Sequence, residues 1–109
     1  MIAAAFAALA LISTPEPEVV PPEVAADLQC IGVLAMHLDN DMSELARQKL
    51  LGNMMYYLGR LEGRDPGTDW VAAMERYSRE TDFEVFDRQN RRCGEELSLI
   101  ERRIEQLGQ

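Results

Sequence analysis

Two cysteines, Cys30 and Cys93, are the feature that most constrains how this chain can fold. They lie far apart in a chain of 109 residues that contains no other cysteine. In an oxidising compartment two such thiols most simply form one disulfide across the domain, whereas in the cytosol they are more typically buried or redox-active. The compartment therefore decides between a cross-linked fold and a reduced one, and the N-terminal sequence bears on the compartment.

Residues 1–14 begin with an unbroken apolar run, MIAAAFAALALIS, that contains no charged side chain. The run is shorter than the roughly 20 apolar residues of a membrane-spanning helix, and it is typical of the apolar region of a signal peptide. No Lys or Arg precedes it, and the alternative is an N-terminal helix that docks or frays. We expect export, with cleavage between Leu11 and Pro15, a periplasmic or secreted protein, and no membrane span in the mature chain.

Residues 15–23 form a second compositional segment, because they hold four of the five prolines together with three glutamates. Proline removes helical hydrogen bonds and favours extended backbone. A proline-rich segment is sometimes a ligand for aromatic-lined grooves, but the glutamates favour an ordinary spacer. We expect a linker here, followed by one domain over residues 24–109.

Apolar residues recur at three- and four-residue steps throughout residues 24–109, and no strand alternation competes with this pattern. The sequence therefore predicts an all-α domain of four helices. Turn and capping residues separate the helices. The helix starts that we expect are, in chain order, Pro22 to Val24, Asp41 or Ser43 with Asp41 as the cap and Glu44 three residues on, Thr68 or Asp69, and Thr81 with Glu84 as a capping box.

The last helix carries a continuous apolar seam with alternating steps of four and three residues, interrupted by one asparagine. Its members are Phe86, Asn90, Cys93, Leu97, Ile100, Ile104 and Leu107. Both cysteines lie on apolar helix faces, so we predict a disulfide that joins the first helix to the last and stabilises the domain by roughly 4 kcal/mol. Two interpretations of the C-terminal half of the seam remain open. It packs in the core against Leu45, Leu50 and Leu58, or it pairs with a second molecule.

The charge distribution disfavours nucleic-acid binding. The net charge is -8, and seven of the 19 acidic residues precede the first basic residue, Arg47. A protein that neutralises phosphates needs a basic face. Arg88, Arg91 and Arg92 form one basic cluster that is able to dock an anion, but acidic neighbours indicate a solvated helix surface whose charges compensate one another.

Catalytic and metal-binding patterns are not evident. Cys30 and His37 are seven residues apart on one helix, about 10 Å along its axis, so they cannot form a catalytic dyad there. An approach of Cys93 to His37 across the bundle requires free thiols. One histidine and two dispersed cysteines do not match zinc-ligand spacing, and we expect no metal or cofactor. Gly52 and Gly59 lie on one helix face, where we expect another helix to approach closely.

The segment YYLGRLEGR, residues 56–64, is the most distinctive stretch of the chain. With the first-helix cysteine and the Arg92-Cys93-Gly94 triplet, it resembles short exported bacterial helical proteins that have no established activity. Size, export, acidity and one helix-linking disulfide also look like the small periplasmic acid-stress chaperones of the HdeA type. We interpret Tyr56, Tyr57, Arg60 and Arg64 as a candidate interaction surface. The alternative for the tyrosines is core packing with surface hydroxyls.

These patterns together favour a non-enzymatic binding or structural role in the cell envelope, as a monomer or weak homodimer with an unidentified protein partner. One alternative is a chaperone-like module that exposes an apolar surface on a trigger such as acid. A second alternative is a small enzyme with a site near residues 56–64.

Overall fold

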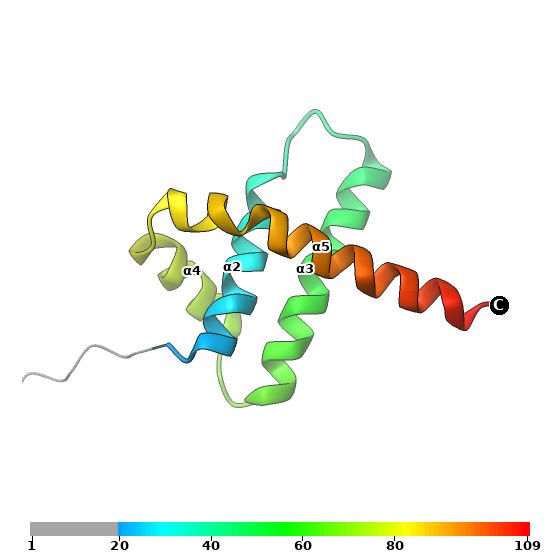
Figure 1. Cartoon of the computed structure of the whole chain (residues 1–109). Coiled ribbons are helices and arrows are strands. Elements are labelled where there is room, and N and C mark those ends of the chain that lie inside the picture. The colour runs from blue at the N-terminus through cyan, green and yellow to red at the C-terminus, as the bar shows by residue number, and fades with distance from the viewer. Residues whose placement is uncertain (1–19) are drawn as a thin grey trace, which may run out of the picture.

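A computed structural model describes residues 20–109 of the chain as four helices (Figure 1). They are α2 (Pro22–Met36), α3 (Glu44–Arg64), α4 (Trp70–Glu80) and α5 (Phe83–Leu107). No strand occurs in residues 20–109, which confirms the prediction of an all-α domain with four helices. The predicted signal peptide and most of the predicted linker, residues 1–19, lie outside the described residues.

Short polar side chains start two of the helices. Both starts are among those expected, but the cap of α3 is Ser43 and not the predicted Asp41. The Ser43 hydroxyl accepts a hydrogen bond from the Ala46 N–H at 3.1 Å and caps α3. The Asp69 carboxylate accepts one from the Ala72 N–H at 3.1 Å and caps α4. Each bond satisfies a backbone donor that has no partner within its own helix.

The predicted capping box at the start of α5 is wrong. Thr81 has extended backbone and ends α4, so the position before α5 falls to Asp82, whose side chain makes no capping bond. The link between α4 and α5 is therefore only two residues long. Because the link is so short, the start of α5 lies close to the end of α4 (Figure 1).

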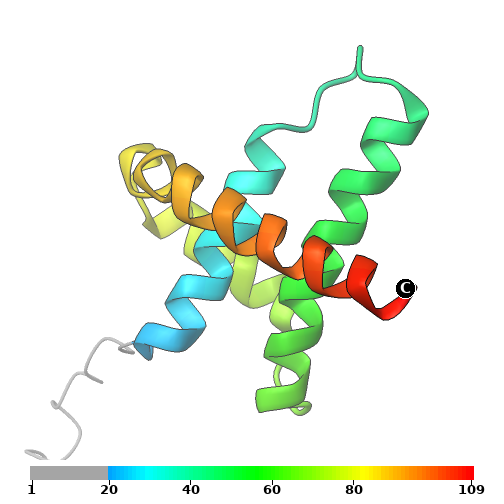
Figure 2. The same ribbon diagram turned by 45° about the vertical axis from the view of Figure 1, so that its right-hand side comes forward.

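Helix α2 is the centre of the fold, because it contacts all three of the other helices. Figures 1 and 2 show α5 running across both α2 and α3, with α4 on the other flank of α2. Nearly half of α2 is buried, and with the other helices it forms one apolar core. The buried core residues are Leu28, Cys30, Ile31, Val33, Leu34, Tyr57, Leu61, Trp70, Phe86, Cys93 and Leu97.

A tight contact between α2 and α5 involves a glycine that the sequence analysis did not single out. A Cβ atom added at Gly32 of α2 would lie 2.3 Å from the Phe86 ring of α5, so only glycine fits there. The expectation for Gly52 and Gly59 is wrong, since a Cβ at either position would meet nothing within 4 Å among the described residues. That side of α3 is open.

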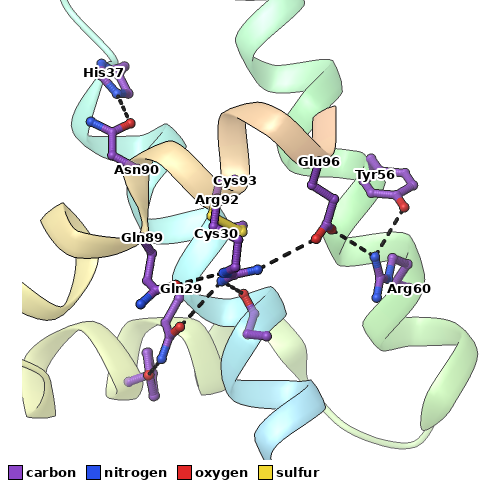
Figure 3. The surroundings of a disulfide bond; sticks show 12 residues. Gln29, Cys30, His37, Tyr56, Arg60, Gln89, Asn90, Arg92, Cys93 and Glu96 are labelled. Atoms are coloured by element: carbon purple, nitrogen blue, oxygen red, sulfur yellow. Dashed lines mark hydrogen bonds and ion pairs between the residues drawn. A yellow bond between two sulfur atoms is a disulfide. The ribbon is translucent and has the colours of Figure 1, made fainter. Parts of the chain in front are cut away.

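The predicted disulfide is confirmed. Cys30 of α2 and Cys93 of α5 are bonded, with their Cα atoms 5.5 Å apart, and both side chains are buried (Figure 3). The bond closes a long loop between the central helix and the last helix. It therefore restricts the unfolded chain strongly and holds α5 at one point along α2.

The apolar seam of α5 divides into a buried half and an exposed half. Phe86, Cys93 and Leu97 are buried, whereas Ile104 is 61% exposed and Leu107 is 85% exposed. The interpretation that the C-terminal half of the seam packs in the monomer's core is therefore wrong for Ile104 and Leu107, whereas Ile100 is half-buried. The expected partner Leu45 is itself 77% exposed. The reason is geometric, because α5 crosses α3 and then projects beyond it (Figure 1).

Candidate functional site

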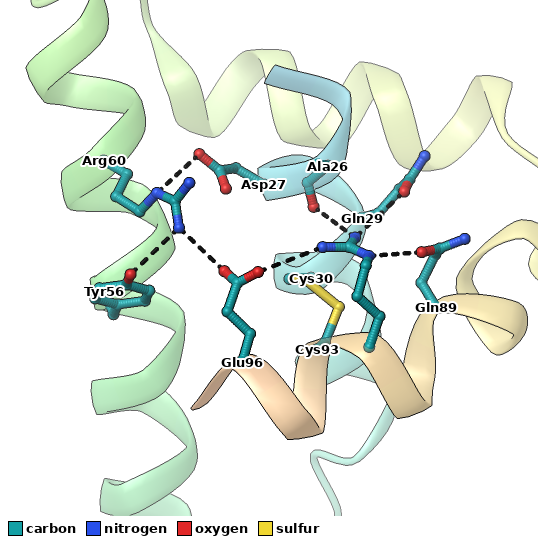
Figure 4. Close-up of polar contacts among 10 residues, drawn as sticks. Ala26, Asp27, Gln29, Cys30, Tyr56, Arg60, Gln89, Cys93 and Glu96 are labelled. Atoms are coloured by element: carbon teal, nitrogen blue, oxygen red, sulfur yellow. Dashed lines mark hydrogen bonds and ion pairs between the residues drawn. A yellow bond between two sulfur atoms is a disulfide. The ribbon is translucent and has the colours of Figure 1, made fainter. Parts of the chain in front are cut away.

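Four charged side chains form a polar cluster beside the disulfide, defined here as Asp27, Arg60, Arg92 and Glu96 (Figure 4; Figure 3 labels Arg92). Arg60 Nε lies 3.5 Å from Asp27 Oδ2, and Arg60 Nη1 lies 3.0 Å from Glu96 Oε1. Arg92 Nη1 lies 3.7 Å from Glu96 Oε2. The polar cluster thus connects α2, α3 and α5 through alternating charges.

Arg92 also ties α5 to the backbone of α2. Its Nη2 donates to the Ala26 carbonyl oxygen at 3.1 Å, and its Nε donates to Gln89 Oε1 at 2.7 Å. The two other arginines of the basic cluster noted in the sequence have different partners. Arg91 pairs with a glutamate one helical turn away, and Arg88 donates to a backbone carbonyl in its own helix. The three arginines therefore do not converge on one anion site.

Asp27 is the one buried charged residue among those described. Burial raises the pKa of its carboxyl group, and the nearby Arg60 and Arg64 guanidinium groups only partly offset that rise. Its Oδ2 atom has no hydrogen-bond partner in the described part of the chain, and Arg60 alone lies within ion-pair distance. The carboxylate therefore carries a desolvation cost that protonation relieves.

The structure separates the four residues of the predicted interaction surface. Tyr57 is fully buried, and burial together with the nearby Glu96 carboxylate raises its pKa above the usual range. The Tyr56 hydroxyl accepts a hydrogen bond from Arg60 at 3.2 Å, so these two residues do lie together. Arg64 is exposed at the end of α3 and lines a different part of the surface.

His37 lies at the C-terminal end of α2, where its Nε2 atom is 3.2 Å from Asn90 Oδ1 (Figure 3). The single asparagine of the α5 seam thus lies at an exposed contact with the end of α2 and not in the core. Cys93 has no free thiol to offer His37, because it is bonded to Cys30. Residues 20–109 also contain no group of three His, Cys, Asp or Glu side chains placed to hold a metal ion.

A groove of about 480 Å³ opens between α2, α3, α4 and the start of α5. We call it the methionine groove, because its lining includes Met36, Met54, Met74, Ile31, Phe83 and Phe86. Phe83 is 65% exposed at its edge. Glu75 is the one charged residue in the lining. Sequence reasoning missed this groove, because methionines at helical spacing look the same whether they fill a core or border a hollow.

A second groove, of about 730 Å³, lies between the start of α2, α4 and the α3–α4 turn. Its apolar lining includes Leu28, Trp70 and Tyr77. The charged residues in its lining are Arg64, Asp65, Arg76 and Glu80. Because both signs are equally represented, charge favours no ligand class at this groove.

Comparison with protein-family models, curated proteins and solved structures found no match. None of the helices in residues 20–109 is both long and apolar enough to cross a membrane.

Proposed function

We propose that this protein is an exported, non-enzymatic binding protein of the cell envelope, and that the methionine groove holds an apolar helical segment of a protein partner. The observation that carries the proposal is the lining of that groove. Three methionines and two phenylalanines border it, and Phe83 and Met36 are exposed at its edge without any rearrangement.

The chemistry of the groove fits a peptide helix. Methionine side chains are flexible and polarisable, so they adapt to apolar partners of different shape. The volume of about 480 Å³ accommodates a few large side chains from one face of an amphipathic helix. Glu75 is the one charged residue in the lining, so a partner helix with a Lys or Arg beside its apolar face gains an ion pair.

Two features support export and a stable scaffold. The apolar N-terminal run is typical of a signal peptide, and a buried disulfide is typical of oxidising compartments. The disulfide fixes α2 against α5, and both of these helices border the methionine groove. The groove is therefore held open by the same contacts that stabilise the fold.

The acid-triggered chaperone alternative has weaker support. Burial raises the pKa of Asp27, so protonation of this carboxyl group stabilises the folded state as the pH falls. A buried carboxyl group of this kind opposes unfolding in acid. Binding at the already accessible methionine groove needs no such trigger.

The enzyme alternative also has weaker support. Tyr56 and Arg60 lie outside the linings of both grooves, and Arg60 is committed to its ion pairs with Asp27 and Glu96. A general acid or base has to lie within hydrogen-bond reach of a bound substrate. Arg64 alone of the four predicted residues lines a groove, and a guanidinium group stays protonated.

The test is binding of a fluorescent peptide of about four helical turns, built from Leu and Lys in an amphipathic pattern. A scrambled peptide of the same composition is its control. We expect Phe83→Gln and Met36→Gln to weaken binding by about tenfold or more, because each removes buried apolar contact. Leu99→Gln is the matched control, since Leu99 is an exposed apolar residue outside both grooves. Equal binding by all variants, or no preference over the scrambled peptide, contradicts the proposal.

A further inference from the structure

Three methionine side chains border the methionine groove, one from each of three helices. Met36 is the last residue of α2, Met54 lies within α3 and Met74 lies within α4. Peroxides convert the thioether of methionine into a polar sulfoxide, and they leave the aliphatic and aromatic side chains of the same lining unchanged. The apolar character of the groove therefore depends on the oxidation state of its methionines.

The three methionines differ in how easily an oxidant in solution reaches them. Met36 is 37% exposed, at the edge of the groove. Met54 and Met74 are half-buried and pack against the apolar core. Because the oxidant has to approach the sulfur atom from solvent, we expect Met36 to be oxidised before the other two.

A fourth methionine provides a comparison within the same molecule. Met55 is 63% exposed, more than any other methionine of residues 20–109, and lies outside the linings of both grooves. It should be oxidised at least as fast as Met36. Its oxidation leaves the lining of the methionine groove unchanged.

We propose that Met36 is an oxidation site whose conversion to the sulfoxide closes the methionine groove to its partner helix, an inference that rests on the proposed function of that groove. The Met36 sulfur takes one oxygen atom from hydrogen peroxide and loses two electrons, and the peroxide is reduced to water. The sulfoxide oxygen binds water, and an apolar helix that covers it has to remove that water. Glu75, the one charged residue in the lining, is a carboxylate and offers the sulfoxide no hydrogen-bond donor.

More extensive oxidation should have a different result. Conversion of Met54 or Met74 places a polar group against the core, which lowers the stability of the fold. The difference in burial therefore predicts two separate stages. Limited oxidation removes partner binding from a folded protein, and extensive oxidation unfolds it.

The test uses the disulfide-bonded protein and the fluorescent Leu–Lys peptide described above, which has no methionine. The protein is treated briefly with hydrogen peroxide, which is removed before the peptide is added. Peptide mapping by mass spectrometry gives the sulfoxide content of each methionine, and circular dichroism reports the fold. When Met36 and Met55 are oxidised and Met54 and Met74 are not, we expect the Kd for the peptide to rise about tenfold. Methionine sulfoxide reductases for both sulfoxide epimers should return the Kd to its starting value.

Two variants assign the effect to one position. Met36→Leu cannot form the sulfoxide, so its Kd after treatment should equal its own Kd before treatment. Met55→Leu is the matched control and should lose binding on treatment as the wild type does. The proposal is overturned if the folded, oxidised wild type binds as before, if Met36→Leu loses binding as much as the wild type, or if Met36 resists oxidation longer than Met54 and Met74. Absence of peptide binding before any treatment contradicts the proposed function itself, so the two failures are distinguishable.

Discussion

The two halves of α5 share one sequence pattern but have opposite surroundings. In the N-terminal half, the seam residues Phe86, Cys93 and Leu97 are buried against the rest of the bundle, and a disulfide fixes the contact. In the C-terminal half, Ile104 and Leu107 follow at the same spacing and are exposed. Periodicity therefore identifies which face of a helix is apolar, whereas the lengths of the neighbouring helices decide how much of that face is covered.

The largest expected effect comes from removing the disulfide of the buried half. The double variant Cys30→Ala, Cys93→Ala should lose about 4 kcal/mol of unfolding free energy, because its unfolded chain is no longer cross-linked. Chemical denaturation monitored by circular dichroism measures this loss. Wild-type protein in reductant is the control and should fall by a similar amount. A loss below about 1 kcal/mol in both would contradict the view that the cross-link holds α5 in place.

Two alanine substitutions, one in each half of α5, compare the halves directly. Leu97→Ala should cost about 2 to 4 kcal/mol, because it leaves a cavity in the core. Ile104→Ala should change the stability of the monomer by less than about 0.5 kcal/mol. Denaturation at micromolar concentration measures both, and equal losses would remove the distinction between the halves.

The contact of Gly32 with Phe86 allows a test of how closely α2 packs against the buried half of α5. Gly32→Ala should cost about 1 to 3 kcal/mol, since its methyl group overlaps the Phe86 ring. The matched control is Gly94→Ala in α5, where the added methyl group meets nothing within 4 Å. The control should be neutral or gain up to about 1 kcal/mol through helix propensity. Equal thermal shifts for the two variants would show that α2 and α5 do not approach as described.

The smallest expected effect is pH-dependent and concerns the polar cluster at the end of the buried half. Since folding raises the pKa of Asp27, the folded state binds its proton more tightly than the unfolded state. The wild type should therefore gain stability relative to Asp27→Asn as the pH falls from about 7 to about 4. Asp87→Asn, an exposed position on α5, controls for the loss of one carboxyl group. Denaturation at several pH values measures the difference, and the opposite trend would contradict the direction of the pKa shift.

Much of the fold could be predicted from local signals. The three- and four-residue spacing identified the helices, and the caps at Ser43 and Asp69 were among the predicted starts, because both signals act within a few residues. The disulfide was predictable because the chain has two cysteines and both lie on apolar helix faces. The start of α5 was missed, since the capping pattern at Thr81 competes with the end of α4.

The candidate site was less predictable, because it depends on distant contacts. Nothing local distinguishes Asp27 from the exposed acids around it, yet it is buried opposite Arg60, which lies on another helix. Tyr56 and Tyr57 are neighbouring residues of the same type, yet Tyr57 is buried and Tyr56 is only half-buried. The position of α3 against α2 decides which of the two side chains points inward. The methionine groove likewise follows from how four segments meet.

Hydrogen–deuterium exchange along α5 tests the central claim most directly. We expect amides from Phe86 to Leu97 to be strongly protected, because contacts with the other helices cover this half of α5. Amides beyond Glu101 should exchange quickly, because Ile104 and Leu107 are exposed there. Equal protection of the two stretches would contradict the division of α5 into a buried half and an exposed half.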